Sequence, residues 1–342
     1  MKAAFFSEIN KVELKEVKEP IIEKPNEVKI KIKDVGICAS DVLGLMGLHP
    51  TRKPPVISGH EASGIVVEVG NEVQDFKIGD RVVIEPQYGC GECYACREGK
   101  YNVCQSKKVL GTTNWSGAFA EYIITPSSTL IRLPSNMSFE MGALLEPLAV
   151  GMHAVKTAKV VKSSTAVIIG CGPIGIACML GCINEGVGKT IMVDIQDYNL
   201  EIAKTLGADV IINSKKENPL AVVMKETNNL GADAIFIAVG TPTVINEAIS
   251  MSKIGACLMT LAHFGSIPPE LDFAKFRYKE LTMKGSVMYT KKDYENCISA
   301  IVEGKINPLP MISKIYPLKD CIEAFDLAVS RKEDYVKLMF SL

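Results

Sequence analysis

Apolar and polar residues alternate strictly over Val28–Lys33, where Val28, Ile30 and Ile32 share one face and lysines occupy the other. A period of two residues is typical of a β-strand with one buried face. Short β-branched or aromatic runs follow, each bounded by Gly, Asn or Pro: Gly64–Val69, Arg81–Glu85 and Phe119–Thr125. Because this region shows no convincing helical periodicity, we predict a β-rich domain, barrel-like or sandwich-like, over residues 1–148.

From about residue 163 the pattern changes to continuous apolar runs separated by helical segments. Apolar strands of this kind are typical of a parallel sheet that helices cover on both faces, and right-handed crossovers favour a doubly wound α/β fold. We expect it over residues 149–290, with residues 291–342, including a helix at Tyr294–Glu303, returning to the first domain. The predicted strands are Ala166–Ile169, Thr190–Val193, Val210–Ile212, Ala234–Val239 and Ala256–Leu261, and the first two helices are Gly175–Glu185 and Asp197–Leu206.

Residues Ser163–Asn184 carry no charge and are numerous enough to be considered as a membrane span. Glycines and a proline in the middle of this stretch favour a strand, a turn and a helix instead, so we interpret it as buried core. The formal net charge is -1, with 38 basic and 39 acidic residues. This balance predicts neither a nucleic-acid nor a membrane partner.

The amino terminus lacks the apolar core of a secretory signal, and we therefore expect a cytoplasmic protein. In a reducing compartment the 11 cysteines are thiols that bind metal, react or pack. Their positions distinguish these roles, because four of them lie within residues 90–104. We expect six of the others to be core residues: Cys171, Cys178, Cys182, Cys257, Cys297 and Cys321.

The four clustered cysteines have the spacing Cys90-x2-Cys93-x2-Cys96-x7-Cys104 in a glycine-rich polar loop. Thiolates this close along the chain can surround one zinc ion tetrahedrally, which leaves no position for a substrate. We therefore predict a structural zinc site. An iron–sulfur cluster uses the same ligands, and the cysteine spacing alone does not exclude it. Disulfides are disfavoured by the reducing compartment.

A G-x-G-x-x-G pattern follows the first predicted strand of the second domain and opens a helix, the context in which it indicates dinucleotide binding. The next strand ends at Asp194, where a carboxylate binds the ribose hydroxyls and repels a 2′-phosphate. Because Ile195 and Gln196 follow it and neither is cationic, we predict NAD rather than NADP. The loop residues assigned to the cofactor are Gly170, Gly172, Pro173, Ile174 and Gly175.

Several motifs in one order resemble the zinc-containing medium-chain alcohol dehydrogenases over essentially the whole chain. The motifs are Gly36-Ile37-Cys38-Ala39-Ser40-Asp41, Gly59-His60-Glu61-Ala62-Ser63-Gly64, the four-cysteine loop, Leu145-Glu146-Pro147-Leu148 and the glycine fingerprint. The Glu-Pro pair is similar to the polyol (sorbitol) and threonine dehydrogenase branches. The resemblance implies a GroES-like catalytic domain, a Rossmann NAD domain, two zinc ions per chain and a homo-oligomer, either dimer or tetramer.

Cys38 and His60 are good zinc ligands, and a catalytic zinc keeps an exchangeable position beside three protein ligands. By resemblance, Glu61 and Glu146 compete for the third place. Zinc would then lower the pKa of the substrate hydroxyl, and Ser40 would take its proton. We expect Asp41 to orient His60 through its other ring nitrogen.

Further cofactor contacts are implied at Val239 and Gly240, beside the adenine and ribose, and at Lys337, beside the phosphates. The alternative for Lys337 is a solvated edge residue. The polyol branch usually has a histidine and a tyrosine where this chain has Leu43 and Gly44, and an arginine where it has Met288. These departures make the pocket less polar and leave the substrate and the proton relay beyond Ser40 open.

The sequence thus predicts a zinc-dependent enzyme that oxidises a secondary alcohol, such as a polyol or diol, to the ketone with NAD. One alternative is an amino-alcohol dehydrogenase of the L-threonine 3-dehydrogenase type. Another is a catalytically silent nucleotide-binding relative, which the retention of Cys38, His60, Glu61 and Glu146 disfavours. The same four residues disfavour a zinc-free quinone reductase of this fold.

Overall fold

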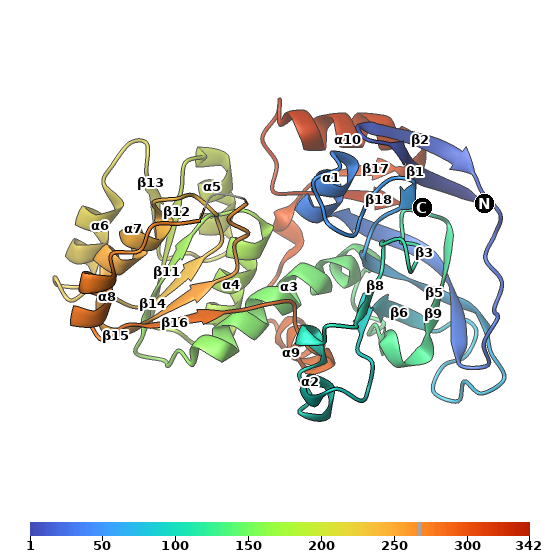
Figure 1. Ribbon diagram of the computed structural model, residues 1–342, viewed down its shortest axis with the longest axis horizontal. Coiled ribbons are helices and arrows are strands. Elements are labelled where there is room, and N and C mark those ends of the chain that lie inside the picture. Colours follow the sequence, from blue (N-terminus) through green and yellow to red (C-terminus); the bar gives the residue numbers. More distant parts are fainter. Residues whose placement is uncertain (266–267) are drawn as a thin grey trace. The chain divides into compact units, whose positions relative to one another are not determined.

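The protein is described by a computed structural model over residues 1–265 and 268–342. These residues form two compact units (Figure 1): unit 1 comprises Met1–Glu146 and Ile312–Leu342, and unit 2 comprises Pro147–Met311. The return to unit 1 therefore begins at Ile312 rather than at residue 291. Helix α9 (Lys291–Val302) stays in unit 2, where Asp293 Oδ2 lies 2.9 Å from His153 Nδ1.

Unit 1, all of whose residues are described, contains a seven-stranded sheet arranged around β3 (Glu27–Ile37). Strand β3 pairs antiparallel with β5 along one edge, and its other edge is shared by β9 and β18. The sheet runs β10-β6-β5-β3-β18-β17, and a second sheet runs β2-β1-β4. The strands are β1 Lys2–Glu8, β2 Lys11–Glu16, β4 Val56–Ile57, β5 Glu61–Val69, β6 Arg81–Ile84, β7 Gln87–Tyr88, β8 Lys108–Val109, β9 Tyr122–Pro126, β10 Leu130–Arg132, β17 Ile312–Pro317 and β18 Lys337–Ser341.

Two helices in this region are not signalled by sequence periodicity. Helix α1 (Ala39–Leu45) is shorter than two full turns, too short for a repeat to show. Helix α3 (Phe139–Ala158) is apolar around most of its circumference and contains Pro147, so it has no polar stripe. The remaining helices of unit 1 are α2 Tyr94–Arg97, η1 Tyr101–Val103, η2 Ser127–Thr129, η4 Leu318–Asp320 and α10 Cys321–Ser330.

The described part of unit 2 contains a parallel sheet in the order β13-β12-β11-β14-β15-β16. Figure 1 shows helices on both of its faces, with α6 and α7 on one side and α4 and α5 on the other. This confirms the doubly wound fold. The elements are β11 Thr165–Ile169, α4 Pro173–Asn184, β12 Lys189–Asp194, α5 Asp197–Thr205, β13 Val210–Asn213, α6 Pro219–Glu226, β14 Ala232–Ile237, α7 Val244–Met251, β15 Ser252–Thr260, α8 Phe273–Tyr278, β16 Thr282–Gly285 and η3 Leu309–Met311.

Alternate residues of these strands face opposite helix layers, which explains their continuous apolar character. Val167, Ile191 and Ile235 belong to the cluster that also contains residues of α6 and α7. The uncharged stretch from Ser163 forms β11, the glycine turn and the buried helix α4. Among the described residues, no helix has the length and apolarity that crossing a bilayer requires.

Candidate active site

The pairing of β3 with its neighbours places three chemically active residues together in unit 1. Gly36 lies opposite Glu61 of β5, and Leu338 of β18 lies opposite Ile37. One step further along β3 and β18, Cys38 therefore comes beside Lys337. A register shift between Ile32 and Asp34 adds one residue to β3 and brings Glu61 into line with Gly36.

The Glu61 side chain crosses the face of β3 to reach Lys337. Lys337 Nζ lies 2.7 Å from each carboxylate oxygen of Glu61, and the two side chains are 1% and 2% exposed. The crossing is possible because Gly36 has no side chain, since a Cβ there would overlap the Glu61 carboxylate. Gly36 is thus required at this position by close approach rather than by its backbone angles.

Lys337 is not a solvated edge residue, so that alternative is wrong. Its ammonium also donates to the Ile37 carbonyl, at 3.3 Å, and these bonds use all three of its protons. These contacts place Lys337 beside Cys38 and Glu61, and its contact with the cofactor phosphates stays a prediction. Burial lowers the pKa of this ammonium, but the charges of Glu61, Cys38 and Glu146 outweigh burial and raise it.

Asp41 connects the loop of Cys38 to the loop of His60. It lies in the first turn of α1 and is fully buried, and its Oδ2 accepts a hydrogen bond from the Cys38 N–H at 3.0 Å. Its Oδ1 accepts from the Ser58 hydroxyl at 2.5 Å and from the Gly59 N–H at 3.2 Å. Burial by itself raises the pKa of Asp41. The charges of His60 and Arg52 have a larger effect in the opposite direction, so the pKa lies well below the usual range of an aspartate.

His60 Nδ1 lies 3.3 Å from Asp41 Oδ1, within ion-pair distance, although the two groups are not aligned as a hydrogen bond. This contact leaves Nε2 as the ring nitrogen available to a metal. Burial and Arg52 lower the pKa of His60, yet the charges of Asp41 and Cys38 raise it to about 10. The negative charges of Asp41 and Cys38 therefore favour a positive charge at this position. A bound metal cation would also supply a positive charge there.

One ligand atom each from Cys38, His60 and Glu61 lies within 4.8 Å of the others, so the three could hold one metal ion. Among the described residues, Glu146 is not part of this group, although it is buried in α3 and its charge acts on Lys337. Ser40 lies in the first turn of α1 and is half-buried. The geometry therefore favours Glu61 over Glu146 as the third ligand.

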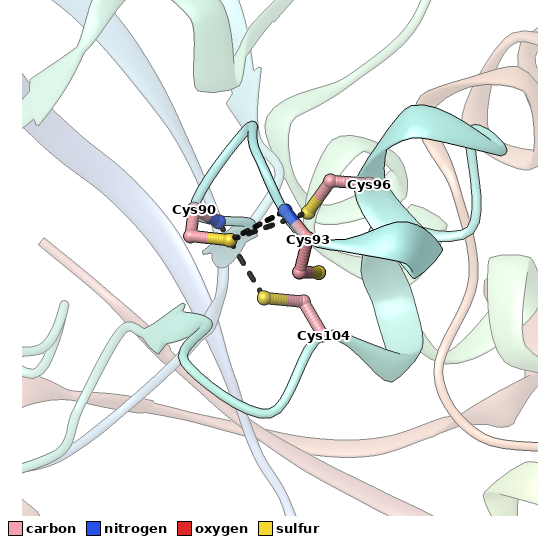
Figure 2. A group of neighbouring side chains, drawn as sticks. All are labelled: Cys90, Cys93, Cys96 and Cys104. Atoms are coloured by element: carbon pink, nitrogen blue, oxygen red, sulfur yellow. Dashed lines mark hydrogen bonds between the residues drawn. The ribbon is translucent and has the colours of Figure 1, made fainter.

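The four clustered cysteines form a second group, in which all the sulfur atoms lie within 4.8 Å of one another. Figure 2 shows them turned toward a common centre. Cys93 immediately precedes α2, Cys96 lies within it, and Cys90 and Cys104 lie in loops. The sulfur atoms of Cys90 and Cys96 are 3.9 Å apart, too far for a disulfide and close to the separation of about 3.8 Å that tetrahedral zinc–sulfur bonds give. Backbone N–H groups of Glu92 and Cys93 lower the pKa of Cys90 to about 7.

The glycine fingerprint forms the turn between β11 and α4 in unit 2. Gly170 has a φ of +103°, and a Cβ at Gly175 would overlap the Gly170 carbonyl, so both positions require glycine. A Cβ at Gly172 would meet no atom within 4 Å, which leaves open space beside the start of α4. Pro173 occupies the first position of this helix, and Ile174 follows it. The turn thus offers backbone N–H groups and room to a pyrophosphate.

Asp194 ends β12 and faces this turn, so it is not an isolated surface aspartate. Its Oδ2 accepts from the Cys171 N–H at 2.6 Å, and its Oδ1 accepts from the N–H groups of Ile195 and Gln196. Val239 and Gly240 follow β14, and a Cβ at Gly240 would overlap the His263 carbonyl. Apart from Lys337, the residues predicted to bind the cofactor thus lie at the carboxyl ends of three neighbouring strands of the unit 2 sheet, where α/β folds bind nucleotides.

Sequence patterns do not identify Arg52, which is 4% exposed and lies outside every motif. Its Nη1 donates to the carbonyls of Leu110 and Gly111, at 2.8 and 2.9 Å, and its charge acts on both Asp41 and His60. Only the folded structure brings it to the site. Of the six cysteines expected in the core, five are buried and Cys257 is half-buried.

A dinucleotide-type fold in one unit and a thiolate–imidazole–carboxylate group in the other are the two parts that a metal-dependent, nucleotide-linked oxidoreductase needs. Comparison with known proteins agrees with this class. Residues 24–135 match the family "Alcohol dehydrogenase GroES-like domain" and residues 173–303 match the family "Zinc-binding dehydrogenase". The chain belongs to the zinc-type alcohol dehydrogenases, as the resemblance predicted.

Named relatives cover nearly the whole chain. The protein is 35% identical to L-idonate 5-dehydrogenase of Vitis vinifera, over 93% of this chain and 88% of the relative. It is 32% identical to sorbitol dehydrogenase of Bacillus subtilis (strain 168), over 99% and 96%. A solved structure of a short chain alcohol dehydrogenase from E. coli CFT073, complexed with NADH, has a TM-score of 0.92 at 27% identity, with 100% and 99% of the two chains covered.

We predict that Lys337→Met destabilises the metal-free protein by about 3–5 kcal/mol, because it leaves the Glu61 carboxylate buried without its partner. Lys314→Met is the matched control, since Lys314 of the adjacent strand β17 forms an exposed ion pair with Glu323. It should cost at most about 1 kcal/mol. Urea unfolding in the presence of a chelator measures both. Equal losses for the two variants would contradict a buried pair, whereas recovery in Glu61→Gln/Lys337→Met would support it.

Asp41→Asn should weaken metal binding at the Cys38–His60–Glu61 group about 10- to 100-fold, because the substitution removes the charge that faces His60. Competition with a coloured chelator measures this affinity. The four-cysteine group provides an internal control, and Asp75→Asn, at an exposed position, provides a second one. Unchanged affinity in Asp41→Asn would show that Asp41 only supports the fold.

Proposed function

We propose that this protein oxidises a secondary alcohol of the polyol or diol class to the ketone and transfers the hydride to NAD. The observation that carries the proposal is the convergence of Cys38, His60 and Glu61 in unit 1. The names of two relatives, L-idonate 5-dehydrogenase and sorbitol dehydrogenase, support the substrate class.

The donor set fits zinc. A thiolate, an imidazole and a carboxylate are ligands that zinc accepts, and three protein ligands leave one position for an exchangeable partner. When bound there, zinc supplies the Lewis acidity that lowers the pKa of an alcohol. We assign a second, structural zinc to Cys90, Cys93, Cys96 and Cys104, whose four sulfur atoms leave no such position.

The chain's own residues keep these ligands in place and handle the proton. Asp41 holds Cys38 and His60 through its two carboxylate oxygens, whereas Lys337 holds Glu61 across Gly36. Ser40, two residues after Cys38, accepts the hydroxyl proton at its Oγ. Because a hydroxyl cannot keep two protons, Ser40 Oγ releases its own proton as it accepts this one.

NAD fits unit 2 through the open space at Gly172 and the carboxylate of Asp194. We infer that the pyrophosphate lies at the start of α4, the ribose diol at Asp194 and the adenosine beside Val239 and Gly240. The carboxylate of Asp194 and the absence of a cation at Ile195 and Gln196 support NAD over NADP. The neighbour complexed with NADH has the same fold.

We further infer a cytoplasmic homo-oligomer, a dimer or tetramer formed through the edge strand β16 of unit 2. An uncovered edge strand offers unpaired backbone groups to a second copy. Large apolar side chains exposed on β15 and α8 support this assignment: Ile254 at 73%, Phe273 at 64% and Tyr278 at 85%.

Initial rates of NAD and NADP reduction test the proposal with polyols, short diols, simple secondary alcohols and L-threonine, before and after chelation. We expect turnover of a polyol or diol with NAD, its loss on chelation and its recovery with zinc. Cys38→Ser should lower kcat/KM at least about 100-fold, because it removes a proposed ligand. Cys257→Ser, at a half-buried thiol outside both cysteine-containing groups, is the matched control and should retain activity.

Three results would contradict the proposal. One is a zinc-loaded protein that turns over no alcohol of the panel with either cofactor. Another is turnover that neither chelation nor Cys38→Ser affects. The third is L-threonine as the preferred substrate, which would favour the amino-alcohol dehydrogenase alternative.

A further inference from the structure

Two lysines, Lys215 and Lys216, lie in the loop that follows β13, the neighbour of β12 in the sheet. The last paired residues of these strands are Asp194 and Asn213. The Ser214 N–H donates to the Asp194 carbonyl at 2.9 Å, which joins this loop to the end of β12. Ser214 also lines a cavity of about 650 Å³ that reaches the ends of β11 and β12. The loop with the two lysines therefore borders the space proposed for the cofactor.

The side chain and the carbonyl of Asn213 fix the course of this loop. Its Oδ1 accepts a hydrogen bond from the Lys215 N–H at 3.0 Å, and its carbonyl accepts from the Lys216 N–H at 2.9 Å. Its Nδ2 donates to Asp197 Oδ1 at 2.7 Å. Because Asn213 is 8% exposed, one buried residue connects the two lysines to the first turn of α5.

Asp197 forms an ion pair with one of the lysines. Lys216 Nζ lies 2.7 Å from Asp197 Oδ2, and the two side chains are 66% and 60% exposed. Hydrogen bonds from Lys216 and Asn213 lower the pKa of Asp197, and the charge of Lys215 acts in the same direction, so this carboxylate is ionised at neutral pH. An ion pair this exposed contributes little to folding, and Lys216 could exchange this partner for another anion.

The carboxylate of Asp194 is engaged by the backbone. It accepts hydrogen bonds from the N–H groups of Cys171, Ile195 and Gln196, which offset part of its negative charge. A 2′-phosphate carries roughly two negative charges at neutral pH, and lysine is a common phosphate ligand. Repulsion by Asp194 alone would therefore have to oppose attraction by the lysines that follow β13.

We propose that Asp197 is a second residue that determines specificity for NAD. It holds Lys216 and adds its own negative charge, and so keeps this ammonium from a 2′-phosphate on the ribose. The inference rests on the proposed function, in which the ribose diol lies at Asp194. Exclusion of NADP then depends on two carboxylates of one turn, and Lys216 is the cation that would accept the phosphate if the charge of Asp197 were removed.

Calorimetric titration of NADH and NADPH into the zinc-loaded protein tests this role through the ratio of the two Kd values. We expect wild type to bind NADH more tightly. Asp197→Asn should shift the ratio toward NADPH by about fivefold or more, because it releases Lys216 and removes one repelling charge. The shift should shrink as NaCl rises, since salt screens exposed charges. Asp197→Asn/Lys216→Met should lose most of the shift, because the released ammonium is gone.

Glu303→Gln is the matched control, because Glu303 forms a comparably exposed ion pair with Lys305 at the end of α9. It should keep the wild-type ratio. A variant that merely distorted the turn would weaken the binding of both cofactors and would not favour NADPH. An unchanged ratio in Asp197→Asn would overturn the inference. A shift that persists in full in Asp197→Asn/Lys216→Met would overturn it as well, because Lys216 would then not be the phosphate ligand.

This inference and the proposed function fail in different ways. A wild type that prefers NADH, together with an Asp197→Asn variant that keeps its ratio, refutes the role of Asp197 alone. A wild type that binds both cofactors alike, or neither, refutes the choice of NAD and with it a residue that enforces this choice. The titration requires no turnover, so it decides the role of Asp197 even if no alcohol of the substrate panel reacts.

Discussion

Glu61 and Lys337 lie where water does not reach, so each charge is stabilised chiefly by the other. Their side chains meet across β3. This strand pairs with β5, which carries Glu61, and with β18, which carries Lys337. A buried ion pair contributes little net stability, but losing one partner is costly. The pair therefore acts as a constraint on register, because Gly36, Glu61 and Lys337 must all stay aligned for it to form.

The return of the chain to unit 1 at its end supplies one half of this pair. Strand β18 supplies the cation that a site rich in thiolate and carboxylate groups needs. The two buried carboxylates beside Cys38 and His60 then take different roles. Asp41 is bonded to the backbone and to Ser58, which fixes it behind the imidazole. The Glu61 carboxylate is bonded to Lys337 and lies within reach of the metal group.

Local patterns were sufficient to predict much of the fold. The alternation at Val28–Lys33 identified β3, and glycines after an apolar strand identified the turn before α4. Local patterns do not predict α1 and α3. Helix α1 is too short to show a helical period, and α3 is apolar on most of its surface, so apolar and polar residues do not alternate along it. The predicted boundary at residue 291 is wrong, because α9 belongs to unit 2 and contacts His153 there, a long-range contact that local patterns do not show.

The site shows the same division between local and long-range information. The candidate metal ligands come from motifs, and the structure brings together the four cysteines and, separately, Cys38, His60 and Glu61, but not Glu146. The partner of Glu61 lies 276 residues away along the chain, so sequence spacing could not reveal it. Arg52 likewise reaches the site through the carbonyls of Leu110 and Gly111, and no motif contains it.

Anomalous X-ray diffraction on both sides of the zinc absorption edge tests the central claim most directly, with crystals grown without a chelator. The account predicts one zinc peak among Cys38, His60 and Glu61, at about 2.0–2.3 Å from their ligand atoms, and a second among the four cysteines. Crystals with zinc in the four-cysteine group and no zinc peak at Cys38, His60 and Glu61 would contradict it.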